Sequence, residues 1–215
     1  MGRPEVVVID YGAGNLFSVR RGLECCGVSV NLTADPEQIL RAQRVVLPGV
    51  GAFGNAMRAL EYLGLVEVIK RVAENNIPLL GICLGMQLLM DESDEFGRTK
   101  GLGLIPGRVV PVPTKTTTGD QQKTPHIDWS AIRPSDRARS WKGTLLEDIQ
   151  SGDSVYFAHS FMAVPSNETH RIAECAYGGH EISAVSGKKN VVGCQFHPEK
   201  SGEVGLKILR RFCGG

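Results

Sequence analysis

The feature that most constrains the fold is an apolar run at residues 78–82 (PLLGI), which leads directly into Cys83 and then into a helical pattern at 84–90. An apolar run of this length is typical of a strand covered on both faces, as in a parallel sheet flanked by helices. The sequence Gly-Ile-Cys-Leu-Gly around Cys83 matches the strand–turn–helix pattern of a nucleophile elbow, with Cys in place of Ser. We therefore expect Cys83 at the carboxyl edge of a buried parallel sheet.

Strand and helix patterns alternate through the first half of the chain, and short strands dominate the second half. Strands are expected at 6–9, 28–32, 45–47, 78–82, 155–157, 172–176, 182–185 and 191–196; helices at 16–25, 36–41 with Asp35 as N-cap, 55–74, 84–90 and 203–212; and a polar loop at 115–124. This order predicts one α/β domain over residues 1–215, with a mostly parallel sheet covered on both sides and antiparallel strands added late.

Charge and composition argue against several classes of protein. The 215 residues carry 24 basic and 23 acidic side chains, so nothing indicates a nucleic-acid or membrane partner. The start, MGRPEVVVID, lacks the pattern of an export signal, and a cytoplasmic location is expected. Six cysteines show neither a CxxC pair nor zinc spacing, so we expect no metal site, and most of them should be buried as small hydrophobes.

Cys83 is the candidate nucleophile. The helix after it should point its N-terminal dipole and free amides at the side chain, favouring the thiolate, which is the attacking species. The alternative is a buried cysteine between two glycines that serve close packing. That explanation is the ordinary one for a lone cysteine, but the strand–turn–helix context favours a nucleophile.

His197 and Glu199 are the candidate base and its orienting acid. They follow the strand pattern at 191–196, and residues two apart in an extended chain point to the same side. The carboxylate can then hold one imidazole nitrogen while the other exchanges a proton with sulfur. As an alternative, the HPE sequence is a turn with a solvated acid. The other histidines are His126, His159, His170 and His180, and none has a carboxylate two residues on at a strand end.

The glycine-rich loop Gly49, Val50 and Gly51 follows the strand at 45–47. Backbone N–H groups there could hold the negative charge of a tetrahedral intermediate, at the same sheet edge as Cys83. An ordinary strand-to-helix turn is the alternative, and the loop alone does not decide between them.

Three blocks, LLGICLGMQLL, LPGVGAFGNAM and VVGCQFHPEKSG, resemble the class I (triad) glutamine amidotransferases. More narrowly, IDYGAGNLFSV and QFHPEKSGEVGLKIL are similar to the glutaminase subunits of imidazole glycerol phosphate synthases. The resemblance runs from residue 6 to residue 212 and is weakest in the polar loop at 115–124.

The resemblance implies a three-layer α/β sandwich and the hydrolysis of L-glutamine through a γ-glutamyl thioester on Cys83, without a cofactor. It implies an oxyanion hole in the loop at 49–51, formed in some members only after a peptide flip triggered by the partner. The family positions that hold glutamine match Gln87, Glu95, Ser160 and Phe161, and those at the partner interface match Asn15, Trp129 and Lys200.

A partner is also expected on chemical grounds. Ammonia released at neutral pH is mostly protonated, and ammonium is not nucleophilic, so a useful glutaminase must pass NH₃ directly to an acceptor site. One glutaminase-sized domain fills this chain, so the synthase should be another polypeptide. In the resembling family that polypeptide is a (β/α)₈ barrel of histidine biosynthesis.

One block departs from the family pattern. Where the family carries PH-x-GWN, this chain reads PHIDWS, with Asp128 and Ser130 in place of Gly and Asn. This leaves open a paralogous subunit that supplies ammonia for amination of a bacterial surface sugar. A stand-alone γ-glutamyl hydrolase or peptidase, a regulatory module with a silent site and a nucleotide-binding oxidoreductase are weaker alternatives. The last would require a third glycine where Phe17 stands.

Overall fold

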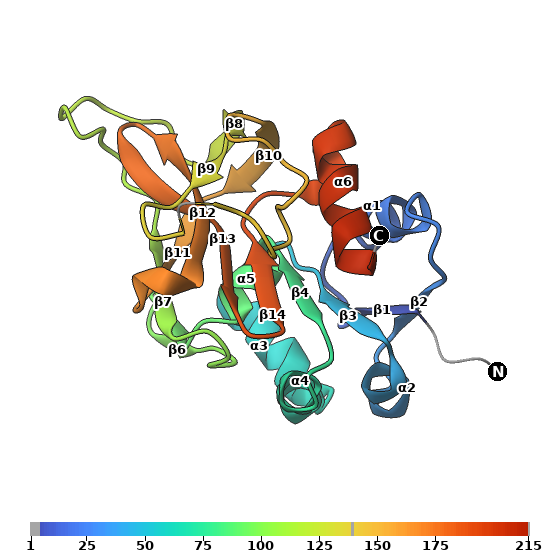
Figure 1. Ribbon diagram of the computed structural model, residues 1–215. Helices are drawn as coiled ribbons and strands as arrows, with labels where there is room; N and C mark the ends of the chain where they lie inside the picture. Colours follow the sequence, from blue (N-terminus) through green and yellow to red (C-terminus); the bar gives the residue numbers. More distant parts are fainter. Residues whose placement is uncertain (1–4, 139, 215) are drawn as a thin grey trace.

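The computed structural model, which describes residues 5–138 and 140–214, is built around an eight-stranded sheet of order β2-β1-β3-β4-β14-β13-β12-β9 (Figure 1). The first five strands of that order are parallel, and β13, β12 and β9 continue the sheet in antiparallel pairing. Their bounds are β1 Val6–Ile9, β2 Val30–Thr33, β3 Arg44–Leu47, β4 Leu79–Ile82, β9 Arg133–Pro134, β12 Arg171–Tyr177, β13 His180–Lys188 and β14 Val191–Cys194. The mostly parallel sheet with late antiparallel strands is confirmed.

Helices cover both faces of the parallel strands, which gives the three layers (Figure 1). One layer contains α1 (Leu16–Glu24) and α6 (Gly202–Cys213); the other contains α2 (Pro36–Arg41), α3 (Phe53–Tyr62) and α4 (Leu65–Glu74). The predicted N-cap of α2 is confirmed, since Asp35 Oδ1 accepts the Glu37 N–H at 2.8 Å.

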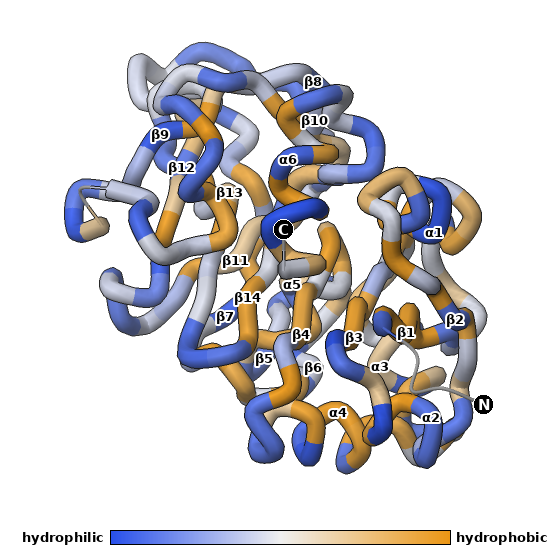
Figure 2. Tube along the Cα trace, turned by 45° about the vertical axis from the view of Figure 1, so that its right-hand side comes forward, coloured by the Kyte–Doolittle hydropathy of each residue, from blue (hydrophilic) through white to orange (hydrophobic). Residues whose placement is uncertain are grey.

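The hydrophobic core is divided in two by the sheet. In β1, Val6 and Val8 belong to the cluster beneath α1 and α6, whereas Val7 and Ile9 belong to the cluster beneath α2, α3 and α4. Successive strand residues point to opposite faces, so an unbroken apolar strand supplies both clusters. Figure 2 shows this as hydrophobic colour along β1, β3, β4 and β14.

The single helix expected at 55–74 is wrong. The structure has two helices there, α3 and α4, and the second begins after Gly64, whose φ is +68°. Only glycine adopts this left-handed conformation without steric cost, and it interrupts the helical hydrogen-bond ladder. Both helices keep an apolar face, so the hydrophobic period continues across the break and hides it in the sequence.

Short strands form two further sheets that the sequence did not resolve. One has the order β11-β7-β5-β6, and the other pairs β10 with β8. Their bounds are β5 Glu92–Ser93, β6 Thr99–Lys100, β7 Gly107–Pro111, β8 His126–Ala131, β10 Ser154–His159 and β11 Phe161–Pro165. Only β10 was expected, near 155–157.

The polar loop between β7 and β8 extends from the body of the protein, at the upper left of Figure 1, beside the β12–β13 turn. A backbone bridge joins Lys115 to Gln121 within it, and the Thr117 N–H donates to Gly178 O at 2.9 Å. This loop is therefore tied both to itself and to the neighbouring hairpin.

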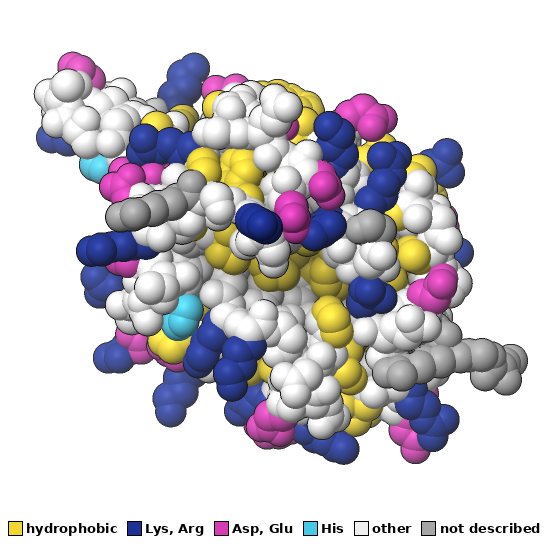
Figure 3. All heavy atoms as spheres, in the orientation of Figure 1, with side chains coloured by type: hydrophobic (Ala, Val, Ile, Leu, Met, Phe, Trp, Pro, Cys, Tyr) yellow, Lys and Arg dark blue, Asp and Glu magenta, His cyan; other side chains and the backbone are white. Residues whose placement is uncertain are grey.

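The surface in Figure 3 carries Lys and Arg side chains interspersed with Asp and Glu, as the balanced charge of the sequence predicts. Within the described part of the chain, every helix is too short or too polar to cross a membrane.

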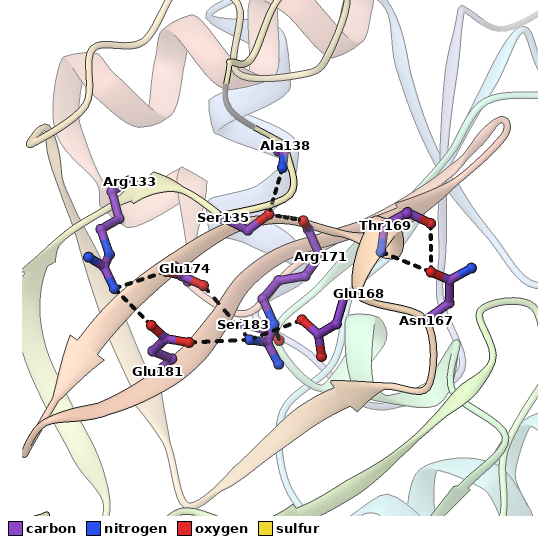
Figure 4. Close-up of polar contacts among 10 residues, drawn as sticks. All are labelled: Arg133, Ser135, Ala138, Asn167, Glu168, Thr169, Arg171, Glu174, Glu181 and Ser183. Carbon is purple, nitrogen blue, oxygen red and sulfur yellow. Dashed lines mark hydrogen bonds and ion pairs between the residues drawn. The ribbon is translucent and has the colours of Figure 1, made fainter.

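An ionic cluster ties the antiparallel end of the sheet together (Figure 4). Arg133 Nη2 lies 3.0 Å from Glu174 Oε1 and 3.0 Å from Glu181 Oε1. Arg171 Nη1 lies 3.8 Å from the other oxygen of Glu174, and its Nε donates to Ser183 Oγ at 3.1 Å. Burial and the charge of Glu181 raise the pKa of Glu174, against the lowering effect of the two arginines. The two arginines therefore stabilise the negative charge of the buried Glu174 carboxylate.

We expect Arg171→Gln to lower the free energy of unfolding by about 2 kcal/mol, because it removes a partner from a buried carboxylate. Arg20→Gln is the matched control, since the Arg20–Glu24 pair is exposed and should contribute less than about 0.5 kcal/mol. Urea unfolding measures both values. Equal losses for the two variants would show that the cluster has no special role.

Candidate active site

Cys83 lies at a sharp bend between β4 and α5 (Leu84–Leu88), with φ 54° and ψ −110°. A non-glycine residue at positive φ is strained by about 1–3 kcal/mol and persists only where its surroundings enforce it. Here they do, because α5 presses closely onto the sheet. A Cβ added to Gly85 would lie 1.8 Å from Leu47 O, and one added to Gly81 would lie 2.7 Å from the Gly85 backbone. Both glycines around the cysteine are thus required by packing, and the predicted elbow is confirmed.

The neighbours of β4 in the sheet decide what surrounds Cys83. β4 pairs with β3 on one side and with β14 on the other. The loop after β3 and the segment after β14 therefore reach the same carboxyl edge as the cysteine.

His197 and Glu199 form a close pair, with His197 Nδ1 2.8 Å from Glu199 Oε1 and both side chains buried. The pairing was predicted, but the extended backbone was not correct. β14 ends at Cys194, and residues Pro198–Lys200 form a 3₁₀ turn that folds the carboxylate back onto the ring. Since Nδ1 faces Glu199, Nε2 is the ring nitrogen that can exchange a proton with Cys83, which lines the same cavity.

The charged form of His197 is favoured in this setting. Burial alone would lower its pKa, but hydrogen bonds to Cys83 and Glu199, and the negative charges of both, raise the pKa to about 10. An imidazolium in this position can donate a proton to a leaving amine, and the neutral imidazole can later accept one from water.

The loop at 48–51 lies beside Cys83, and Val50 and Gly51 line the same cavity. Gly49 is packed behind it, where an added Cβ would lie 2.7 Å from the Tyr11 hydroxyl and 2.9 Å from Leu84 Cβ. The Tyr11 hydroxyl donates to Pro48 O at 2.8 Å and so anchors the loop. The loop is in place for an oxyanion hole, and that role remains a prediction.

The cavity at this edge has a volume of about 380 Å³, within the range of small-molecule sites. It brings together Cys83 and His197 with all four residues expected to hold glutamine, namely Gln87, Glu95, Ser160 and Phe161. Glu95 also has a local structural function, because its Oε2 accepts the Phe53 N–H at 2.5 Å at the start of α3.

The three residues expected at a partner interface have different surroundings in this structure, and their function there stays a prediction. Lys200 lines the cavity, and Trp129 is 52% exposed on β8. Asn15 does not line the cavity; its side chain caps α1 by accepting the Ser18 N–H at 3.3 Å. A capping function accounts for Asn15 within this chain.

The sequence predicted Gln87 at the site but not its buried partner, the side-chain amide of Gln195. Gln87 Nε2 donates to Gln195 Oε1 at 3.1 Å, and Gln195 Nε2 lies 3.8 Å from Cys83 Sγ as a donor. Gln195 follows β14 directly and stands two residues before His197, but a lone Gln gives no sign in the sequence that its amide is buried. His159, which lines the cavity, was considered only as a rival to His197.

Other cysteines lack such surroundings. Burial raises the pKa of Cys175 to about 12 and raises that of Cys194 further, so both thiols stay protonated at neutral pH. They behave as the small buried hydrophobes that the sequence predicts.

A cysteine at a strained elbow, with an imidazole–carboxylate pair at the edge of a three-layer α/β fold, defines the class of cysteine-dependent α/β enzymes. The family model described as glutamine amidotransferase class-I matches residues 7–214. The chain belongs to that family.

Relatives with high identity support the assignment. The chain is 50% identical over 207 residues to "Imidazole glycerol phosphate synthase subunit HisH 1" of Legionella pneumophila (strain Lens), covering 96% of this chain and 97% of the relative. It is 47% identical over 207 residues to "Imidazole glycerol phosphate synthase subunit HisH" of Geobacillus thermodenitrificans, covering 96% and 94%. Among solved structures, a "putative gmp synthase subunit a protein" of Thermoplasma acidophilum has a TM-score of 0.69 at 19% identity, covering 100% of this chain and 94% of that one. That likeness concerns the fold.

We expect Glu199→Gln to shift the alkaline limb of the pH profile of kcat/KM for glutamine hydrolysis to lower pH. Because the pKa of His197 is raised, the ring stays protonated at pH values above its ordinary pKa of 6.5. Losing the negative charge of Glu199 lowers that pKa again. Because the pKa of His197 is higher in the folded protein, the stability that the His197–Glu199 pair contributes is fully present below pH 6.5. It is lost as the pH rises through about 10.

Glu203→Gln is the control for this measurement, because that carboxylate is exposed in the first turn of α6. An alkaline limb that stays in place in Glu199→Gln would argue against the orienting function of the carboxylate.

Proposed function

We propose that this chain is the glutaminase subunit of an imidazole glycerol phosphate synthase, which hydrolyses L-glutamine and delivers ammonia to a synthase subunit. The observation that carries the proposal is the near-complete, 50% identical match to a subunit of that name. The cavity at Cys83 supports it, because the candidate nucleophile, base and substrate-binding residues all lie there.

The proposed reaction begins with attack of the Cys83 thiolate on the carboxamide carbon of glutamine. The negative charge on the former carbonyl oxygen would be held by N–H groups of the loop at 49–51. His197 then protonates the departing nitrogen, and NH₃ leaves a γ-glutamyl thioester on Cys83. Water, deprotonated by His197, attacks the thioester, and glutamate departs with the thiolate restored. The balance is glutamine and water in, glutamate and ammonia out.

Substrate contacts follow from the cavity wall. Both N–H groups of the Gln87 amide are used, one by Phe161 O at 2.8 Å and the other by Gln195 Oε1. Its remaining oxygen is an acceptor suited to the α-ammonium group of glutamine. Glu95 would add a negative charge, and Ser160 a hydroxyl, on the same wall.

The synthase partner, a (β/α)₈ barrel in the proposed complex, would cover the rim of the cavity. Exposed apolar side chains stand there or on the adjoining strand, with Val50 46% exposed, Ile127 58% and Trp129 52%. A cluster of exposed large apolar groups beside a polar cavity is typical of a surface that another protein covers. Lys200 lies among them and would pair with an acidic group of the partner.

The departure from the family pattern at 128–130 raises one alternative, an ammonia-supplying subunit for amination of a bacterial surface sugar. Asp128 Oδ1 accepts the Trp129 N–H at 2.8 Å, a contact that glycine cannot make. The two possibilities use the same glutaminase chemistry and differ in the acceptor. Reconstitution with a histidine-pathway cyclase distinguishes them, since only the first possibility yields glutamine-dependent imidazole glycerol phosphate.

We expect Cys83→Ala to abolish ammonia release, because the thiolate is the nucleophile that forms the thioester. Folding and partner binding should stay intact. Coupled detection of glutamate measures the loss, and thermal unfolding checks the fold. Cys25→Ala, at an exposed cysteine, is the control. Retained turnover in Cys83→Ala would rule out the mechanism.

We also expect glutamine hydrolysis by the isolated chain to be very slow and to rise at least about a hundredfold, or ~3 kcal/mol, with the synthase and its substrate. Steady-state kinetics with and without the partner measures this. Full turnover by the chain alone would instead identify a stand-alone hydrolase.

A further inference from the structure

A chain of hydrogen bonds runs from β8 to the wall of the cavity. Ser130 Oγ lies 2.9 Å from His126 Nε2, and His126 Nδ1 lies 3.1 Å from His159 Nε2. His159 Nδ1 lies 2.8 Å from Phe161 O. The proposed mechanism uses neither histidine, and both are buried.

The direction of every bond in this chain can be assigned. Burial lowers the pKa of His126 to about 4, against an opposing effect of Asp128, and lowers that of His159 to about 3, against its hydrogen bond to Phe161. Both rings are therefore neutral near pH 7, each with one N–H.

Phe161 O can only accept, so the proton of His159 is on Nδ1. Its Nε2 must then accept from His126 Nδ1–H. The Nε2 of His126 is then an acceptor, and the Ser130 hydroxyl donates to it. One pair of tautomers, with the proton on Nδ1 of both rings, satisfies all three contacts.

The packing leaves these rings little freedom. His126 is stacked between Phe157, at a centroid distance of 4.9 Å, and Tyr177, at 3.9 Å. His159 stands edge-on to His126 at 5.1 Å. Rotation of either ring would break its hydrogen bonds in this chain.

The chain of hydrogen bonds ends at the backbone carbonyl of Phe161, which also contacts a residue of the cavity wall. Phe161 O accepts from His159 and also from Gln87 Nε2 at 2.8 Å. Gln87 in turn orients the Gln195 amide, whose Nε2 faces Cys83 Sγ. A displaced Phe161 carbonyl would therefore turn the amide that faces the substrate.

We propose that His126 and His159 are positioning residues for the glutamine site, and that the Ser130 hydroxyl sets the direction of the hydrogen bonds that hold them. The proposal rests on the glutaminase function proposed above. Ser130 and His126 do not line the cavity, so their effect on substrate must pass through His159 and Phe161.

The first test is nitrogen-15 NMR of the histidine-labelled wild-type chain at neutral pH, without substrate. We expect both His126 and His159 as neutral rings protonated on Nδ1, the less common form in water. An Nε2–H form or a cation at either position overturns the proposal. This readout does not require activity, so it fails or succeeds independently of the proposed function.

The second test is the kinetics of Ser130 variants in the complex with the synthase subunit. Ser130→Ala removes the donor and should raise KM for glutamine about fivefold, as expected for one hydrogen bond, with kcat within about twofold. Ser130→Asn returns a donor and should restore KM. Ser151→Ala, at an exposed turn, is the control.

Thermal unfolding of each variant shows whether the fold survives. An unchanged KM in Ser130→Ala, or no difference between the Ala and Asn variants, overturns the proposal. Should Ser130→Ala not fold, the tautomers of the wild-type chain still decide it.

Discussion

The approach of α5 to the sheet is the contact on which the active site depends. Gly85 lies so close to Leu47 O that a single methyl group there would overlap it, at 1.8 Å. This contact places the helix directly over the end of β4, and the chain can reach it only by turning through the strained conformation of Cys83. The thiol is thereby held outward at the edge of the sheet, between the segments that follow β3 and β14.

Two buried imidazoles near this thiol differ in charge because their neighbours differ. His197 contacts a carboxylate and the sulfur, and its pKa is raised; His159 contacts a backbone carbonyl and a neutral ring, and its pKa is lowered. Burial disfavours the cation in both, so the added negative partners decide the outcome. One ring is suited to proton transfer, and the other to fixed hydrogen bonding. The same residue type thus serves two functions within one cavity.

The errors of sequence interpretation have a common cause. The helix predicted at 55–74 continued across Gly64 because apolar spacing does not report backbone handedness. The pairing of His197 with Glu199 was foreseen from an extended geometry, whereas a 3₁₀ turn produces it. In the second half, two-residue strands such as β5 and β9 have too few residues for any period to be recognised. Hydrophobic periodicity shows which face of a helix or strand is buried. The features that were missed depend instead on local backbone angles or on pairing partners far away in the sequence.

The sequence by itself determined the parallel α/β sheet, the elbow at Cys83 and the pairing of His197 with Glu199. These are encoded locally, in apolar runs, in glycines and in the HPE sequence, so they can be read along the chain. Only the tertiary structure decided that β4 lies between β3 and β14, that the Gln195 amide, bonded to Gln87, faces the thiol, and that Ser130, His126 and His159 form one chain of hydrogen bonds. Those contacts join residues far apart in sequence, and hydrogen-bond direction depends on three-dimensional neighbours that no local pattern specifies.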